Sequence, residues 1–142
     1  MPYNLKDKSK FRDKLLSGQS DISVKETTNK FMVFSLKDID RNQGQSFLDW
    51  HNCALLHIML DKLHEFSKKT LPEAQRMNFT IYDNFPKESD FEHPDHIAPD
   101  AKWASMHIQG LECIAGHLVG NIFHIVFLDK DHRFWITHKK HT

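Results

Sequence analysis

The spacing of hydrophobic residues along the chain predicts a strand, then a helix, then a run of short strands. Residues 30–38 (KFMVFSLKD) combine aromatic and aliphatic side chains in the short apolar run typical of a buried strand. Residues 46–70 repeat apolar side chains every three to four positions, which predicts one long amphipathic helix. Ser46 followed by Asp49 matches a helix-capping pattern, and we expect Pro72 to end the helix.

The second half of the chain consists of short apolar runs separated by turn residues. Residues 77–85 alternate apolar and polar side chains, as a half-buried strand does. Residues 86–102 contain three prolines and predict a long loop. Further strands are predicted at residues 103–109, 111–118, 122–128 and 133–137. The sequence therefore predicts an α+β fold: a first strand, one long amphipathic helix, and an antiparallel meander of four to five strands packed on that helix.

Length and polarity predict a single domain preceded by an arm. The chain has 142 residues, of which 39% are hydrophobic, enough for one continuous core. Residues 1–29 are polar and charged and predict an N-terminal arm with at most a short helix, so residues 30–142 would form the α+β domain. The charged start lacks the apolar segment of a signal peptide, and no apolar run approaches the length of a membrane span. We therefore expect a cytoplasmic protein without a membrane partner.

Composition narrows the classes of function. Lys and Arg together number 19, as do Asp and Glu, so the formal net charge is zero and does not indicate a bulk electrostatic DNA binder. The sequence contains no P-loop, GxGxxG or GxSxG motif, which leaves nucleotide hydrolysis, dinucleotide chemistry and α/β-hydrolase catalysis without support. Cys53 and Cys113 lie in apolar segments without CxxC spacing and predict buried free thiols. The unusual feature is the presence of 11 histidines.

The most apolar stretch, GHLVGNIFHIVFLDKDHRFW (residues 116–135), contains histidines at positions where a core strand would have aliphatic residues. Gly120-Asn121 between two apolar runs predicts a two-residue β-hairpin turn. Such a turn places His117 directly opposite His124, with Cβ atoms roughly 4.5–5.5 Å apart. The same register predicts Ala115 opposite Val126 and Cys113 opposite Leu128, and a core-facing side made of Ile114, Leu118, Phe123, Ile125 and Phe127.

Paired imidazoles in apolar surroundings have three possible roles. They could be structural residues hydrogen-bonded to nearby acceptors, or ligands of a metal ion. They could also act as general base and general acid in cleavage of RNA, where one group removes the 2′-hydroxyl proton and the other protonates the leaving oxygen. A cation must then hold the phosphate, and Arg133, Lys130 or the C-terminal HKKH at residues 138–141 could supply it. On this hypothesis the catalytic residues are His117, His124, Arg133 and Lys130.

The predicted loop adds further candidates. His93, Asp95 and His96 have the H-x-x-H spacing that supplies two ligands to a divalent metal, although no third ligand is fixed by spacing. A solvated, turn-forming loop is the simpler interpretation. Alternatively, the loop covers the histidine pair as a lid and supplies His93 or His96 to substrate binding. Trp135 could stack on a base, although core packing is the commoner role of such residues.

The stretch at residues 116–135, with HPDH upstream and FMVFSLKDID before the helix, resembles a group of small bacterial and phage-associated proteins of unassigned role. The resemblance covers roughly residues 30–135. The order of strand, helix and meander is also loosely similar to ribonuclease toxins of the RelE type, and this architectural likeness implies a toxin–antitoxin system. The neutral charge of this chain departs from the strongly basic character of those toxins.

Three functional hypotheses follow. The leading one is a small toxin-like RNA-directed nuclease that uses the histidine pair without a metal cofactor, with RNA as its partner. The alternative is a non-enzymatic interaction module, such as an immunity, antitoxin-like or phage-encoded inhibitor protein, with a small protein partner. The third is a metal-dependent hydrolase that uses His93, Asp95 and His96.

Overall fold

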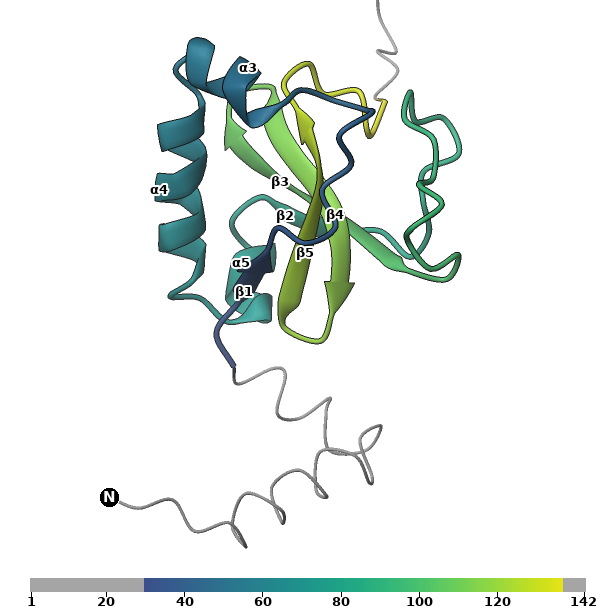
Figure 1. Ribbon diagram of the computed structural model, residues 1–142. Coiled ribbons are helices and arrows are strands. Elements are labelled where there is room, and N and C mark those ends of the chain that lie inside the picture. The colour runs from purple at the N-terminus through teal and green to yellow at the C-terminus, as the bar shows by residue number, and fades with distance from the viewer. Residues whose placement is uncertain (1–29, 137–142) are drawn as a thin grey trace, which may run out of the picture.

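A five-stranded sheet organises residues 30–136, the part of the chain that the computed structural model describes (Figure 1). In space the strands follow the order β1-β5-β4-β3-β2. Strands β2, β3, β4 and β5 pair antiparallel with one another, whereas β1 pairs parallel to β5 at one edge. The strands are β1 (Val33–Ser35), β2 (Phe79–Ile81), β3 (Lys102–Gln109), β4 (Glu112–Val119) and β5 (Ile122–Asp129). The predicted arm at residues 1–29 lies outside the described residues.

The mixed α+β architecture is confirmed, but the prediction of one long helix is wrong. Three short helices occupy this part of the chain: α3 (Phe47–Asn52), α4 (Leu56–Phe66) and α5 (Leu71–Gln75). The predicted start is correct, because the backbone N–H of Asp49 donates to Ser46 Oγ and that of Ser46 donates to Asp49 Oδ2, each at 3.0 Å. Within residues 30–136, no helix is long and apolar enough to cross a bilayer.

The helix breaks after Asn52 because the chain forms a Schellman motif. Ala54 has a left-handed φ of 58°, the Leu55 N–H donates to the Trp50 carbonyl at 2.8 Å, and the Ala54 N–H donates to the His51 carbonyl at 3.0 Å. Trp50 and Leu55 are both buried in the core, which supplies the hydrophobic contact that accompanies this motif. This helix end could not be predicted from the sequence, because the left-handed position is alanine and not the usual glycine.

Pro72 begins a helix where we expected it to end one. It lies in the first turn of α5, where its missing N–H has no intrahelical partner to lose. The Thr70 N–H donates to Glu73 Oε1 at 3.0 Å, which completes the start of this helix.

Hydrophobic side chains pack on both faces of the sheet. Helix α4 runs along one face, and the loop that precedes β3 lies on the other (Figure 1). The loop face carries a smaller, mainly aromatic core made of Ile97, Trp103, Ala115, Val126, Phe127 and Phe134. The helix face carries the larger core, which includes Met32, Trp50, Leu55, Met59, Phe66, Phe79, Met106, Ile114, Leu118, Phe123, Ile125 and Leu128.

The hairpin turn at Gly120-Asn121 forms as predicted, but a β-bulge shifts the register beyond it. Gly120 has φ 62°, and Val119 pairs with Ile122, Leu118 with Phe123 and His117 with His124. Gly116 then pairs with Ile125 and Ala115 with Phe127, so Val126 is the extra residue of the bulge. The predicted pairs of Ala115 with Val126 and Cys113 with Leu128 are therefore wrong, and Phe127 and Leu128 exchange faces.

Two further sequence predictions are corrected. Residues 133–136 form no strand; instead the buried carboxylate of Asp129 accepts the backbone N–H groups of Arg133 at 2.7 Å and Phe134 at 2.8 Å, which turns the chain back over the sheet. Cys113 is buried as predicted, but Cys53 is exposed because it caps the C-terminal end of α3.

Glycine at position 116 is required by the close approach of two strands. A Cβ there would lie 2.0 Å from the His124 carbonyl oxygen. We expect Gly116→Ala to lower the free energy of unfolding by about 3 kcal/mol, measured by urea denaturation. Gly110→Ala is the matched control: it introduces a left-handed alanine but no backbone clash, and should cost about 1 kcal/mol. Equal losses in the two variants would contradict the close approach.

Glycine should be better than alanine at position 54. Ala54→Gly removes the strain of a left-handed alanine, partly offset by the extra freedom of glycine in the unfolded chain, for a net gain of about 0.5 kcal/mol. Ala74→Gly, inside helix α5, should instead destabilise by about 1 kcal/mol or more. Thermal or urea unfolding of both variants tests the prediction, and a loss of stability in Ala54→Gly would refute the assigned helix end.

Candidate functional site

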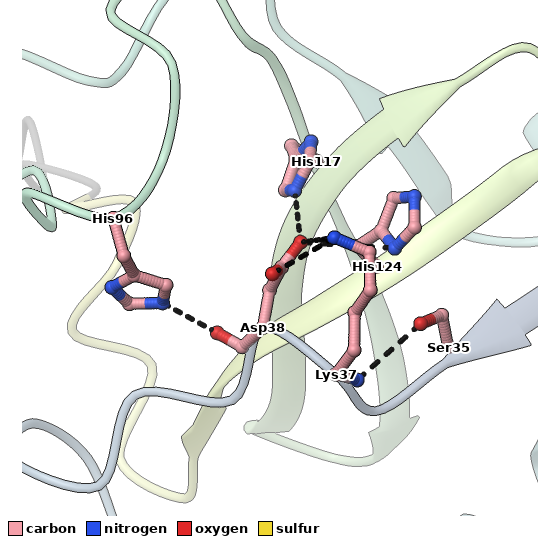
Figure 2. A network of polar contacts seen from close by, with 6 residues as sticks. All are labelled: Ser35, Lys37, Asp38, His96, His117 and His124. Carbon is pink, nitrogen blue, oxygen red and sulfur yellow. Dashed lines mark hydrogen bonds and ion pairs between the residues drawn. The ribbon is translucent and has the colours of Figure 1, made fainter.

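A turn at the edge of the sheet brings a carboxylate to the predicted histidine pair. The edge segment pairs with β5 at Ser35, opposite His124, and contacts it again where the Asp40 N–H donates to the Val126 carbonyl at 2.9 Å. The chain therefore advances five residues, from Ser35 to Asp40, while β5 advances only two, from His124 to Val126. The surplus residues bulge out as a turn, and this turn places Asp38 over the histidine-bearing face (Figure 2).

His117 and His124 lie side by side on neighbouring strands, as the hairpin register predicted. Their ring centroids are 4.7 Å apart and the ring planes meet at 20°. Trp103 flanks His117 on the next strand, with ring centroids 6.2 Å apart, so the pair belongs to the aromatic face of the sheet. The side chains of His117, His124 and Asp38 are 12%, 10% and 13% exposed, so solvent reaches only their edges.

The two imidazoles have different hydrogen-bonding environments. His117 Nε2 lies 2.9 Å from Asp38 Oδ2, and because a carboxylate accepts, the imidazole N–H donates. His124 Nδ1 lies 3.8 Å from the same oxygen and is a buried polar atom without a hydrogen-bond partner. Lys37 Nζ contacts both carboxylate oxygens of Asp38, at 3.1 and 3.0 Å. One carboxylate therefore organises an imidazole and an ammonium, while the second imidazole stays unpaired.

Local burial and charge shift the ionisation of two of these groups. Burial lowers the pKa of His124, and the nearby His117 and Lys37 lower it further, against an opposing effect of Asp38. For Asp38, burial acts to raise the pKa, but the hydrogen bonds from His117 and Lys37 and their positive charges outweigh it, so the net pKa is lowered. The arrangement thus favours an ionised Asp38 beside an uncharged His124.

The loop preceding β3 reaches the site through His96. Its Nε2 lies 2.9 Å from the Asp38 backbone carbonyl, so the imidazole donates and ties the loop to the turn (Figure 2). His93 lies deeper, with Nδ1 3.0 Å from the Pro94 carbonyl and its ring packed against Phe85 and Trp103. Of the two predicted lid histidines, His96 therefore touches the site and His93 lines the aromatic core beneath the loop.

Two of the predicted cations, Arg133 and Lys130, do not lie at the histidine pair, and the HKKH segment at residues 138–141 lies outside the described residues. Arg133 forms an ion pair with Asp90. Lys130 follows the far end of β5, six residues beyond His124, or about 20 Å along the strand. Among residues 30–136, Lys37 is the basic residue whose ammonium contacts the carboxylate beside the pair. Trp135 stacks on Tyr82, with centroids 4.8 Å apart and planes at 9°, and is 43% exposed, so one aromatic face remains open to solvent.

Three of the site's side chains are capable of holding a metal ion. Within residues 30–136, the group with converging ligand atoms is Asp38, His117 and His124, whose candidate ligand atoms all lie within 4.8 Å of one another. His93, Asp95 and His96, the trio suggested by sequence spacing, does not form such a group in that part of the chain: His93 and His96 have separate backbone partners.

Comparison with known proteins gives no relative to guide the assignment. The chain matches no protein-family model, no curated protein and no solved structure. The function is therefore inferred from the chemistry of the site.

Sequence reasoning found the histidine pair but missed Asp38 and Lys37. Both residues close the first predicted strand, which was expected to be buried but is a short, partly exposed edge strand in the structure. The missing information was that this strand pairs parallel with β5 and brings its end to the hairpin.

Stability should depend on pH through His124. Because the folded-state pKa lies below the unfolded value near 6.5, the unfolded chain binds more protons, and stability is lost as pH falls through this range. In metal-free buffer, the stability of the wild type relative to His124→Asn should be greater at about pH 7.5 than at about pH 5. The exposed His57 is the matched position, and His57→Asn should show no such change. A pH-independent difference for His124→Asn would contradict the assigned environment.

Proposed function

We propose that this chain is a small RNA-directed nuclease whose reacting groups are His117 and His124, positioned by Asp38. The observation that carries the proposal is the pair of adjacent imidazoles with unlike partners, one bonded to a carboxylate and the other unpaired. Acid–base cleavage needs two such groups, one to accept a proton and one to donate it. The toxin-like role, which the loose architectural similarity to RelE-type ribonuclease toxins suggests, is part of the same proposal.

The geometry supports distinct roles for the two histidines. His124 has a free ring nitrogen and acts as the base that removes the 2′-hydroxyl proton. The oxygen left by that proton attacks the adjacent phosphorus, and the bond to the 5′-oxygen breaks. His117 donates a proton to the leaving 5′-oxygen, and Asp38 orients the ring and stabilises the positive charge that it carries. The products are a 2′,3′-cyclic phosphate and a free 5′-hydroxyl.

Lys37 is the phosphate-binding cation in this mechanism, the role predicted for Arg133 or Lys130. Its side chain is 67% exposed while its ammonium contacts Asp38, so it can turn toward a phosphate at the mouth of the site. An ammonium held there would stabilise the charge that develops on the phosphoryl oxygens. His96 is also exposed at this mouth and remains a candidate for substrate binding, together with the open face of Trp135.

The narrow opening sets a condition on the reaction. With the three central side chains only 10–13% exposed, a phosphodiester reaches the imidazoles only after Lys37 or His96 has released Asp38. Both contacts involve exposed side chains, which are easily displaced. The alternative hypothesis of an interaction module with a small protein partner stays a prediction.

The proposal predicts metal-independent RNA cleavage by the purified protein. A labelled single-stranded RNA incubated with the chain in EDTA should yield cyclic-phosphate ends, whereas DNA of the same sequence should stay intact because it lacks the 2′-hydroxyl. His117→Gln and His124→Asn should each lower the rate by about 100-fold or more, and Lys37→Met by about 10-fold.

The exposed His57 provides the control, since His57→Asn should leave the rate unchanged. Circular dichroism and thermal unfolding would establish that each variant is folded. Cleavage that survives in the folded His117→Gln, His124→Asn double variant, or no cleavage of any RNA by the wild type, would show that the proposed function is wrong.

A further inference from the structure

The cluster of Asp38, His117 and His124 has the donor atoms and spacing of a metal site. We propose that these three side chains bind a divalent transition-metal ion of the zinc class, and that the bound ion switches off acid–base cleavage. The binding itself is independent of the proposed function; the inhibitory consequence rests on it.

The distances match a tetrahedral ion after small movements. Zinc binds imidazole nitrogen and carboxylate oxygen at about 2.0–2.2 Å, so two ligand atoms on one tetrahedral ion lie roughly 3.4 Å apart. The two imidazole nitrogens lie 2.9 and 3.8 Å from Asp38 Oδ2, which brackets that separation. All three candidate ligand atoms lie within 4.8 Å of one another, so side-chain rotations that move these atoms by up to about 1 Å would bring them to the separation that one tetrahedral ion requires.

The unpaired nitrogen of His124 supplies an independent reason for a ligand. His124 is buried, and its Nδ1 faces Asp38 without a hydrogen-bond partner. A buried polar atom without a partner is unfavourable, and most such atoms in folded proteins are paired. A cation between His124 and Asp38 would satisfy this nitrogen and the carboxylate together.

The ligand set indicates which ions should bind. Two imidazoles and one carboxylate suit zinc and similar transition metals, whereas magnesium and calcium prefer oxygen ligands throughout. Three protein ligands also leave a coordination position for water. His96 already donates to the Asp38 backbone, and an outer contact of this kind helps to fix the orientation of a liganding group.

Metal occupancy and acid–base chemistry exclude each other at this site. The ion would take the lone pair of His124 that the cleavage reaction uses as a base, and would displace the proton between His117 and Asp38. Zinc should therefore act as an inhibitor that competes for the reacting groups.

Lys37 should affect metal binding and RNA cleavage in opposite directions. Its ammonium contacts both oxygens of Asp38 and so competes with a metal cation for the same carboxylate. Lys37→Met should raise zinc affinity by about 10-fold while lowering RNA cleavage, an opposite pair of effects from one substitution.

The test is titration of the full-length, untagged, EDTA-stripped protein with zinc chloride by calorimetry, and with cobalt chloride by visible absorption. The wild type should bind one zinc ion that His124→Asn and His117→Gln bind about 100-fold more weakly, with a matching loss of the tetrahedral cobalt spectrum. His57→Asn should bind like the wild type, and magnesium should not compete. Zinc should also raise the unfolding temperature of the wild type but not of His124→Asn.

The outcomes distinguish this inference from the proposed function. Zinc binding of equal strength in wild type and His124→Asn overturns the metal site, whatever the RNA assay shows. Site-specific binding by a protein that never cleaves RNA supports the metal site and overturns the nuclease. Cleavage that requires zinc overturns both the inhibitory role and the metal-free mechanism, whereas cleavage in EDTA that zinc abolishes supports both proposals.

Discussion

The pairing of the first described strand with the last one is the constraint on which the site depends. β1 pairs parallel to β5 for three residues, and the chain contacts β5 again at Asp40 and Gln45. These contacts fix both Ser35 and Asp40 against β5. The turn between them is therefore constrained to project across the sheet. Asp38 is thereby held beside two imidazoles that are 79 and 86 positions away in the sequence.

The two faces of the sheet are covered by different elements, and buried polar side chains such as His124 lie on the aromatic face. Helices cover the face that carries the larger core, and its buried side chains are nearly all apolar. The other face is covered by a loop and by residues after β5, with rings that pack edge to face or stacked. On that face backbone carbonyls accept from His93 and His96 and the Asp38 carboxylate accepts from His117, whereas His124 Nδ1 stays without a hydrogen-bond partner.

Several elements could be predicted because their signals are local. The Ser46–Asp49 cap, the Gly120-Asn121 turn and the apolar runs of β3 to β5 each depend on residues within a few positions of one another. Errors arose where a longer-range fit overrode the local pattern. Ala54 has a left-handed conformation, and Trp50 and Leu55 on either side of it both pack in the core. The bulge at Val126 places Phe127 on the aromatic face, whereas strict alternation along the strand predicts the opposite face.

By itself, the sequence determined the α+β class, the hairpin and the facing of His117 and His124, because a two-residue turn fixes which residues lie opposite. Only the tertiary structure decided that Asp38 and Lys37 join the pair and that Arg133 and Lys130 do not. The order of strands in a sheet is determined by packing across the whole domain. A parallel pairing at the edge has no local sequence signal in the residues that it brings together, so it could not be predicted from them.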